Sequence, residues 1–324
     1  MALPLSLSNR LRLPLIGAPM FLASTPRLVV AQCQAGIVGA VPALNARSTD
    51  LLDDWLAELA ALLERPIRAG TRAAAPFAVN QIVSRTNRRQ DQDLSIMVKH
   101  RVPIVITSVG APGDVVAAVH SYGGLVFHDV VSVKHAEKAV TAGVDGIVAV
   151  CAGAGGHGGT LNPFAFVNEI RRFYSGALLL AGTLTSGKDL LAAQVMGADL
   201  GYIGTRFLAS EECEIDHDYK HMLVGSNADG IVNTALFSGL HGNYLARSIA
   251  QSGLDPDNLP LPDGPGVGTG GHGDFKLWKD IRAAGQGVGG ITDIPSVADL
   301  VARLETEYQC ALSRLAGLPK HAES

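Results

Sequence analysis

The sequence predicts an α/β protein of the TIM-barrel class, a (β/α)8 barrel with a smaller, mostly helical second region. Two observations predict this class. About eight short apolar runs alternate with longer amphipathic runs over roughly the first 200 residues, which is the rhythm of β–α units. The apolar runs are rich in Val, Ile, Leu and Ala and do not alternate with polar residues. Parallel strands that are covered by helices on both faces have this composition.

A doubly wound sheet is the structural alternative. It is disfavoured because the first β–α turn, GAPMFLAS, lacks the G-x-G-x-x-G pattern of dinucleotide-binding sheets. The helical patterns include TDLLDDWLAELAALLER and VKHAEKAVTAGV. The expected strands cover 15–20, 36–44, 77–82, 103–109, 125–131, 146–152, 177–183 and 200–207.

The β–α rhythm breaks after residue 207, and a segment rich in Pro, Gly and Asp covers 252–275. An amphipathic helical pattern, SVADLVARLETEYQCALSRL, closes the chain. We therefore predict three parts. Residues 1–210 form the barrel, 211–275 an irregular and helical insertion on the substrate side, and 276–324 a C-terminal segment that packs back on the barrel.

The composition predicts a compact protein that acts on a small molecule. Hydrophobic residues make up 47% and charged residues 17%, and the net charge of −4 argues against a nucleic-acid partner. The one dense basic run, RTNRRQ at 85–90, is interpreted as a solvated loop. We recognise no signal peptide or membrane-spanning run, and the four scattered cysteines form no C-x-x-C pair. A cytoplasmic location without a membrane partner is expected, and a homodimer is left open.

The ends of strands 7 and 8 carry glycine–threonine pairs. In a barrel the active groups lie where strands end, and these two strands usually supply the phosphate site. Gly182, Thr183, Gly204 and Thr205 offer backbone N–H groups that large side chains do not obstruct, together with two hydroxyls. Ordinary turn glycines are the alternative interpretation. The two loops together predict a ligand that bears a phosphate.

The other strand ends carry few charged groups. They are APM at 18–20, Asn80, Ser108, and the neighbours His128 and Asp129. No dense acidic cluster indicates a metal site, so no metal is expected. His128 lies inside a strand and is interpreted as a barrel-wall residue. Small and flat-lying residues at these ends favour a large, partly apolar ring across the mouth of the barrel.

Five segments occur in order at plausible strand ends: APM at 18–20 followed by TPRLVVAQCQAGIVG, PFAVN at 76–80, AGGHGG at 154–159, GADLGYIGTRFL at 197–208 and AGQGVGGI at 284–291. In these segments the sequence resembles the nitronate monooxygenases, formerly called 2-nitropropane dioxygenases. Flavin-dependent enoyl-acyl-carrier-protein reductases and NADH:quinone reductases are near relatives of that family. The resemblance extends from Leu13 to about Ile291.

The resemblance implies a barrel that binds FMN at its mouth. It implies that His157 faces the substrate as the catalytic residue. The residues that it implies for cofactor binding are Ala18, Pro19, Met20, Asn80, Gly155, Gly156, Gly182, Thr183, Gly204, Thr205 and Gln286.

Three segments depart from the family pattern. Asp129 stands where relatives often have Lys or Gln, and we expect it to tune the flavin or substrate pocket. AGTLTSG at 181–187 stands where relatives often have a second glycine and an acidic residue. FSGLHGNYLARS at 237–248 replaces an expected Arg-containing segment and offers His241 and Tyr244 as candidate substrate residues.

His157 stands among glycines directly after an apolar run, in VAVCAGAGGHGGTLNPF. The glycines let the loop approach a flat ring, and an imidazole can accept or donate a proton near neutral pH. The alternative is a histidine that only satisfies loop carbonyls.

Three functions are considered for this site. The main prediction is the FMN-dependent oxidation of an alkyl nitronate by O2. The alternative is an NAD(P)H-dependent FMN reductase that acts on an enoyl thioester, a quinone or a similar acceptor. A non-redox barrel with a phosphate ligand is the third, and it lacks a Schiff-base lysine at a strand end.

Overall fold

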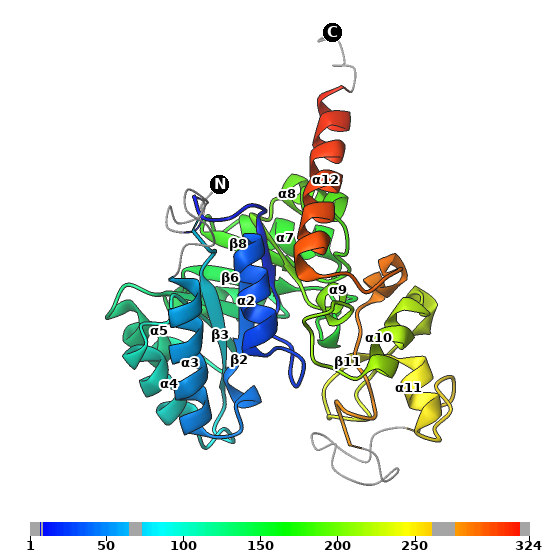
Figure 1. Ribbon diagram of the computed structural model, residues 1–324, viewed down its shortest axis with the longest axis horizontal. Helices are drawn as coiled ribbons and strands as arrows, with labels where there is room; N and C mark the ends of the chain where they lie inside the picture. The colour runs from blue at the N-terminus through cyan, green and yellow to red at the C-terminus, as the bar shows by residue number, and fades with distance from the viewer. Residues whose placement is uncertain (1–6, 8, 65–72, 261–275, 318–324) are drawn as a thin grey trace.

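Eight parallel strands close into a barrel in the computed structural model, which describes residues 7, 9–64, 73–260 and 276–317 (Figure 1). The first strand pairs with both the second and the last, since Ile16 lies opposite Val38 and opposite Tyr202. This closure confirms the TIM barrel and excludes the doubly wound sheet. The barrel strands are β1 Leu15–Gly17, β2 Val38–Pro42, β3 Phe77–Val83, β4 Ile104–Val109, β5 Leu125–Val130, β6 Gly146–Val150, β8 Ala177–Ala181 and β9 Leu200–Ile203.

Helices cover the outside of the barrel (Figure 1). Local sequence signals set their ends: in α8, Ser186 and Asp189 form a reciprocal capping box, and Gly197 ends the helix at φ +112°. The helices are α2 Pro26–Ala35, α3 Thr49–Leu63, α4 Gln90–Lys99, α5 Gly113–His120, α6 Val133–Thr141, α7 Pro163–Arg171, α8 Gly187–Met196, α9 Thr205–Leu208, α10 His217–Val224, α11 Ala246–Gln251 and α12 Val297–Ala316, with 3-10 turns η1 Ala43–Asn45, η2 Ala228–Gly230 and η3 Gln286–Gly290.

Alternate strand residues fill the inside of the barrel. Phe127 of β5 belongs to a buried cluster with residues such as Ile16, Ile106 and Leu179 from other strands. Its neighbour His128 faces the opposite side of the strand, where its Nδ1 lies 2.8 Å from Thr107 Oγ1. His128 is buried, and this burial lowers the pKa of its ring to about 4. The prediction of a barrel-wall histidine is therefore confirmed.

The second region contains a small antiparallel sheet besides its helices. Strands β10 Ile231–Thr234 and β11 Gly242–Leu245 pair with each other, and β11 also pairs with β7, Gly156–His157, from the glycine loop of the barrel. This sheet differs from the irregular and helical region that the sequence predicts here. The second half of the Pro- and Gly-rich segment, residues 261–275, lies outside the described residues.

The C-terminal helix α12 packs against α8 and α2 on the outside of the barrel (Figure 1). After β9 the chain forms only the short α9 before it enters the second region. The helix α12 therefore occupies the outer position beside the last strands that a regular β–α unit would fill. The contact between α8 and α12 is close at Gly187. If this glycine carried a Cβ atom, that atom would lie only 1.9 Å from the carbonyl oxygen of Leu304.

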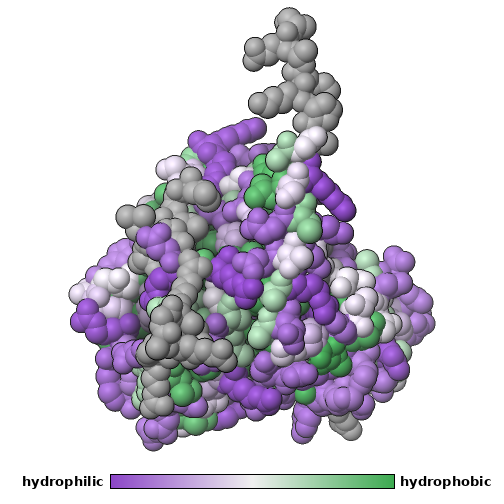
Figure 2. All heavy atoms as spheres, turned by 45° about the horizontal axis from the view of Figure 1, so that its top comes forward, coloured by the Kyte–Doolittle hydropathy of each residue, from purple (hydrophilic) through white to green (hydrophobic). Residues whose placement is uncertain are grey.

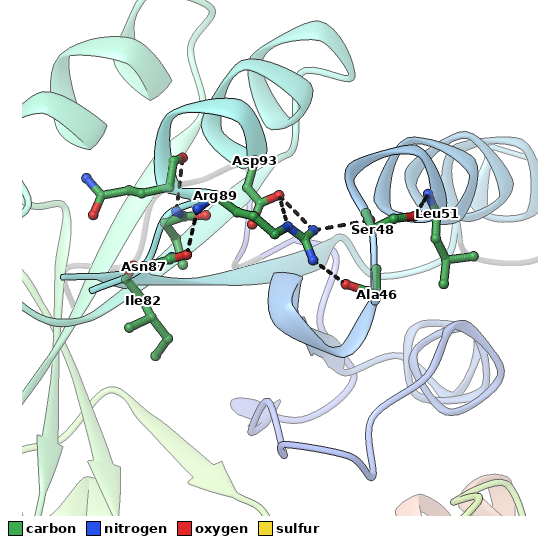
Figure 3. Close-up of polar contacts among 9 residues, drawn as sticks. Ala46, Ser48, Leu51, Ile82, Asn87, Arg89 and Asp93 are labelled. Atoms are coloured by element: carbon green, nitrogen blue, oxygen red, sulfur yellow. Dashed lines mark hydrogen bonds and ion pairs between the residues drawn. The ribbon is translucent and has the colours of Figure 1, made fainter. Parts of the chain in front are cut away.

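Arg89 connects two loops at the carboxyl end of the barrel (Figure 3). Its guanidinium donates to the carbonyl oxygens of Ala46 at 2.6 Å and Ser48 at 3.1 Å, and it pairs with the buried carboxylate of Asp93 at 2.8 Å. The prediction of a solvated basic loop is thus wrong for Arg89. The basic side chain compensates a carboxylate that the packing of α4 buries.

One face of the molecule is mainly polar. Figure 2 shows a face on which hydrophilic side chains predominate and hydrophobic ones form separate groups. None of the helices in the described ranges is long and apolar enough to cross a membrane.

Candidate active site

Three polar side chains form a hydrogen-bonded chain across β3, β4 and β5. Asn80 Nδ2 donates to Ser108 Oγ at 2.8 Å, and Ser108 Oγ donates to Asp129 Oδ2 at 2.7 Å. Asn80 also donates to the carbonyl oxygen of Ile106 at 3.0 Å. These side chains stand two residues beyond barrel-filling residues such as Phe127, so they share the inner face of the barrel. The structure thereby brings together Asn80 and Asp129, which the sequence placed on separate strand ends.

Two buried oxygens at this end make no hydrogen bond within the described chain: Asp129 Oδ1 and the hydroxyl of Tyr202 on β9. Burial raises the pKa of Asp129 to about 6, against the opposing effect of the Ser108 hydrogen bond. Burial, and then the charge of Asp129, raise the pKa of Tyr202. A buried polar group without a partner costs about 1–3 kcal/mol, so these oxygens indicate a polar ligand group that would pair with them.

The loops after β8 and β9 have the geometry of an anion site. Gly182 and Thr183 adopt positive φ values of +127° and +62°, which is strained for a β-branched residue. Gly204 precedes the short α9, and its carbonyl oxygen accepts from the N–H groups of Phe207 and Leu208, which leaves those of Thr205 and Arg206 without an acceptor in the helix. A Cβ on Gly204 would lie 3.5 Å from Met20 Sδ and 3.6 Å from Ala18 Cβ. The ends of β1 and β9 are therefore neighbours. Pro19, between these two β1-loop residues, is half-buried.

The glycine loop approaches the β8 loop and η3. A Cβ on Gly153 would lie 2.6 Å from Thr183 Cγ2 and 2.8 Å from Gln286 Oε1. The N–H of Gln286 donates to the carbonyl oxygen of Gly153 at 2.9 Å. This small residue lets three distant segments meet, and it places Gln286 beside the loop after β8.

Thr205 is a second residue at which the glycine loop and the segment before η3 come together. Its Oγ1 accepts a hydrogen bond from the N–H of Gly285 at 2.9 Å, and a Cβ on Gly155 would lie 3.0 Å from the same oxygen. A threonine hydroxyl has one donor and two acceptor sites, so the O–H of Thr205 is still available to an anion.

His157 is the exposed member of β7, opposite Gly242 of β11. Its Nε2 lies 2.7 Å from Ser238 Oγ, and Trp278 packs against the ring edge-on at a centroid distance of 5.2 Å. Removal of water by these neighbours lowers the pKa of the imidazole. Gly156, at φ +69°, leaves the space that Trp278 approaches. The ring is accessible and has the protonation state of a base at neutral pH.

The two candidate substrate residues are placed differently. Tyr244 is fully buried in the core of the second region, and its hydroxyl lies 3.4 Å from Ser238 Oγ. It is therefore a packing residue that is linked to His157 through Ser238 and through Trp278, which contacts both rings. His241 is exposed, but its Nδ1 is 2.8 Å from Asn233 Oδ1. Its carbonyl oxygen, not its ring, contacts the His157 loop, by accepting from the N–H of Gly158.

Three residues of the site are absent from the sequence-based prediction. Tyr202 shares the inner face of β9 with Leu200, so the two-residue period of the strand could have identified it. Asn243 donates to the carbonyl oxygen of Ala154 at 2.6 Å and fixes the glycine loop. Ser238 contacts a residue 81 positions away. No local pattern could have identified these last two contacts.

A polar cavity of about 660 Å³ adjoins the loops after β8 and β9, on the side of α12. Thr183 and Gln286 line it, and so do the basic side chains of Lys188, Arg206 and Arg303. Arg206 is engaged with Asp293 at 2.7 Å. Within the described ranges, no three His, Cys, Asp or Glu side chains are grouped to hold a metal ion.

Comparison with known proteins identifies the family of this chain. The family model described as nitronate monooxygenase matches residues 6–255. The chain is 28% identical to a nitronate monooxygenase of Paraburkholderia phytofirmans, over 93% of this chain and 94% of that protein.

Other relatives carry different names. A 5-hydroxy-7a-methyl-1-oxo-octahydro-1H-indene-4-carboxyl-CoA dehydrogenase of Rhodococcus jostii is 23% identical over 74% of this chain and 64% of that protein. Among solved structures, nitroalkane oxidase from Streptomyces ansochromogenes matches with a TM-score of 0.76 and 20% identity, over 96% of this chain and 99% of that one. FabK from Thermotoga maritima matches with a TM-score of 0.76 and 23% identity, over 95% of this chain and 96% of that one. These structures share the barrel fold, and the match of the family model over most of the chain confirms the resemblance of the sequence. The chain therefore belongs to the nitronate monooxygenase family of FMN-dependent oxidoreductases.

Proposed function

We propose that this protein oxidises alkyl nitronates with O2, using bound FMN and His157 as its acid–base residue. One observation carries the proposal: an exposed imidazole of lowered pKa stands on a strand of the glycine loop, and that same loop touches the β8 and β9 loops. A proton-accepting group and an anion site thus belong to one connected structure.

The residues of the site fit FMN. The N–H groups after β8 and β9, with the Thr205 hydroxyl, would hold the phosphate, because helix starts and glycine turns favour an anion. The unpaired Asp129 Oδ1 and Tyr202 hydroxyl offer polar partners for the edge of a ring. Ala18, Met20 and Gly204 would allow a flat group to lie close to the backbone. The bound cofactor would supply the two-electron oxidation that no side chain can provide.

His157 would act on the carbon next to the nitro group. A neutral imidazole can take the proton from that carbon, and the nitroalkane then becomes the nitronate anion. The resulting imidazolium would stabilise this anion through its charge. A nitronate that is supplied already deprotonated needs no base, so for that substrate His157 would only bind and orient.

The variant His157→Asn tests this role. It should fold and retain FMN, and it should lose about 10²–10⁴-fold in turnover of a neutral nitroalkane. With a preformed nitronate the loss should shrink and appear mainly in KM. Oxygen uptake with each substrate measures both effects, and His221→Asn, an exposed histidine on α10, is the matched control. Wild-type turnover of both substrates in His157→Asn would show that the ring is structural.

A second candidate function is the reduction of an enoyl thioester or quinone with NAD(P)H. The carboxyl-CoA dehydrogenase among the relatives favours it, since the name of that enzyme describes a thioester substrate. Anaerobic addition of NADH or NADPH to the holoenzyme separates the two functions. Rapid bleaching of the flavin absorbance, with no oxygen uptake on nitronate, would favour the reductase.

We also propose a cytoplasmic location. Cys33, Cys151 and Cys213 are free and buried, and burial raises the pKa of the Cys33 and Cys151 thiols to about 12. Free thiols are typical of a reducing compartment, and cell fractionation tests the location. The assembly, for which a homodimer is left open, can be determined from the mass of the holoenzyme in solution.

A further inference from the structure

The hydroxyl of Ser238 lies at the centre of a small polar group behind His157. Ser238 Oγ is 2.7 Å from His157 Nε2, 3.4 Å from the Tyr244 hydroxyl and 3.0 Å from the carbonyl oxygen of Leu240. The backbone N–H of Leu240 also approaches it at 3.4 Å. No side-chain charge takes part in this group.

The number of protons on the Ser238 hydroxyl determines in which of its hydrogen bonds Ser238 is the donor. A serine hydroxyl has one proton and two acceptor sites. A carbonyl oxygen can only accept, so the Ser238 proton serves the contact with Leu240. Tyr244 is fully buried, and within the described chain its hydroxyl lies 3.4 Å from Ser238 Oγ. With its own proton directed at the Leu240 carbonyl, Ser238 Oγ can only accept from His157, so the 2.7 Å contact requires a proton on Nε2 of the ring. The longer 3.4 Å contacts of the Tyr244 hydroxyl and the Leu240 N–H share the second acceptor site.

From this geometry we propose that Ser238 is a positioning residue that holds His157 as the Nε2–H tautomer and leaves Nδ1 as the proton-accepting atom. The catalytic part of this inference rests on the proposed function, whereas the tautomer itself does not. His157 Nδ1 makes no hydrogen bond to another residue in the described ranges, so its lone pair is free for a substrate.

In the alternative arrangement, Ser238 donates its hydroxyl proton in a hydrogen bond to an unprotonated His157 Nε2. The ring would then carry its own proton on Nδ1 and could not accept one there. That arrangement would also leave the Leu240 carbonyl without its hydroxyl donor. The two arrangements therefore differ in which ring nitrogen can act as the base.

The surroundings of His157 allow a clear titration. Among the described residues, Tyr244 is linked to His157 through Ser238, and the ring of the nearby strand residue His241 is turned to Asn233. Trp278 is uncharged. Partial removal of water from the ring lowers the pKa of His157, with no contribution from a charged side chain of the described residues.

The first experiment observes the tautomer without any mutation of the group. The holoenzyme is labelled with [15N]histidine, and the signals of His157 are assigned by their absence from His157→Asn. We expect a protonated Nε2 and an unprotonated Nδ1 in the neutral ring. A proton on Nδ1 would overturn the proposal whether or not the enzyme oxidises nitronates.

The second experiment uses the direction of a titration shift. The acceptor Ser238 Oγ favours the imidazolium, because a hydrogen bond from a charged donor is about twice as strong as one from a neutral donor. Ser238→Ala should therefore lower the NMR titration midpoint of His157 by about one pH unit, and Ser238→Thr should restore it. If Ser238 instead donated to Nε2, its removal would raise the midpoint, and that result would contradict the proposal. Ser252→Ala, at the end of α11, is the matched control.

Kinetics connect the tautomer to the reaction. Ser238→Ala should lose about tenfold in kcat/KM with a neutral nitroalkane and little with a preformed nitronate, while Ser238→Thr recovers activity. An equal loss with both substrates would reject a positioning role in proton transfer. Should His157→Asn keep wild-type turnover, the proposed function fails, and the NMR result alone still decides the tautomer.

Discussion

At the scale of single residues, Asp129 has the most unusual environment of the site. Its carboxyl group lies on the inner face of β5. Ser108 donates to one of its oxygens and the other has no partner in the described chain. A carboxyl group with a pKa raised to about 6 can be protonated under mildly acidic conditions and then donates a hydrogen bond.

The raised pKa predicts a pH dependence of stability. Between the ordinary value of 3.8 and about 6, the folded apoprotein binds a proton that the unfolded chain has lost. The contribution of Asp129 to the free energy of unfolding therefore falls as pH rises through this window. Asp129→Asn removes this slope, so its stability relative to the wild type should rise by on the order of 1–3 kcal/mol between pH 4 and 6 and then stay constant.

Urea unfolding of the two apoproteins at several pH values measures this difference. Asp54→Asn, at an exposed position on α3, is the matched control. A difference between variant and wild type that does not change with pH would mean that Asp129 titrates equally in the folded and unfolded chains.

At the scale of elements, the contact between α8 and α12 completes the outer layer of the barrel. The first residue of α8, Gly187, is packed directly against the backbone of α12, and its N–H donates to Glu307 Oε2 at 2.8 Å. A Cβ at this position would also lie 2.4 Å from the N–H nitrogen of Tyr308. Backbone atoms inside a helix cannot yield as a flexible side chain does, so the helices must move apart to accept a methyl group.

We expect Gly187→Ala to reduce the free energy of unfolding by about 1–3 kcal/mol, despite the better helix propensity of alanine. Urea unfolding followed by circular dichroism measures this loss. Gly113→Ala is the matched control, because Gly113 opens α5 with no atom within 4 Å of its Cβ position. Equal stability of the two variants would show that α12 does not press on α8 in solution.

At the scale of the whole molecule, the barrel and the second region share structure. Strand β7 comes from the glycine loop of the barrel and pairs with β11 of the second region. The η3 segment returns from the second region and is hydrogen-bonded to Gly153 and, through Gly285, to Thr205. Because both regions complete the same loops, we expect them to unfold as one unit.

The two tryptophans test this coupling. Trp55 lies on α3 of the barrel, and Trp278 contacts His157 and Tyr244. In Trp55→Phe, the fluorescence of Trp278 and the far-ultraviolet circular dichroism should show the same urea midpoint. FMN at 100 times its Kd should stabilise both signals by about 2.7 kcal/mol. Loss of the Trp278 signal at lower urea than the circular dichroism signal would indicate independent unfolding of the second region.

The sequence by itself determined the barrel class and the places of its strands, and it predicted which loops carry function. Continuous apolar runs report burial on both faces, and glycines after a run report a tight turn, so both signals are local. Met20, Asn80, His157 and Thr205 could be assigned to strand ends in this way. The family segments added the cofactor and the prediction of a catalytic role for His157.

Only the tertiary structure decided which of these residues meet. Ser238 lies 81 positions from His157 and reaches it because β11 pairs with β7, and neither strand has a local signal of that pairing. Tyr244 looked like a pocket residue in the sequence, yet packing buries it completely. The physical reason is that periodicity encodes the burial of each segment against an unspecified neighbour. The identity of the neighbour follows from the packing of the whole chain.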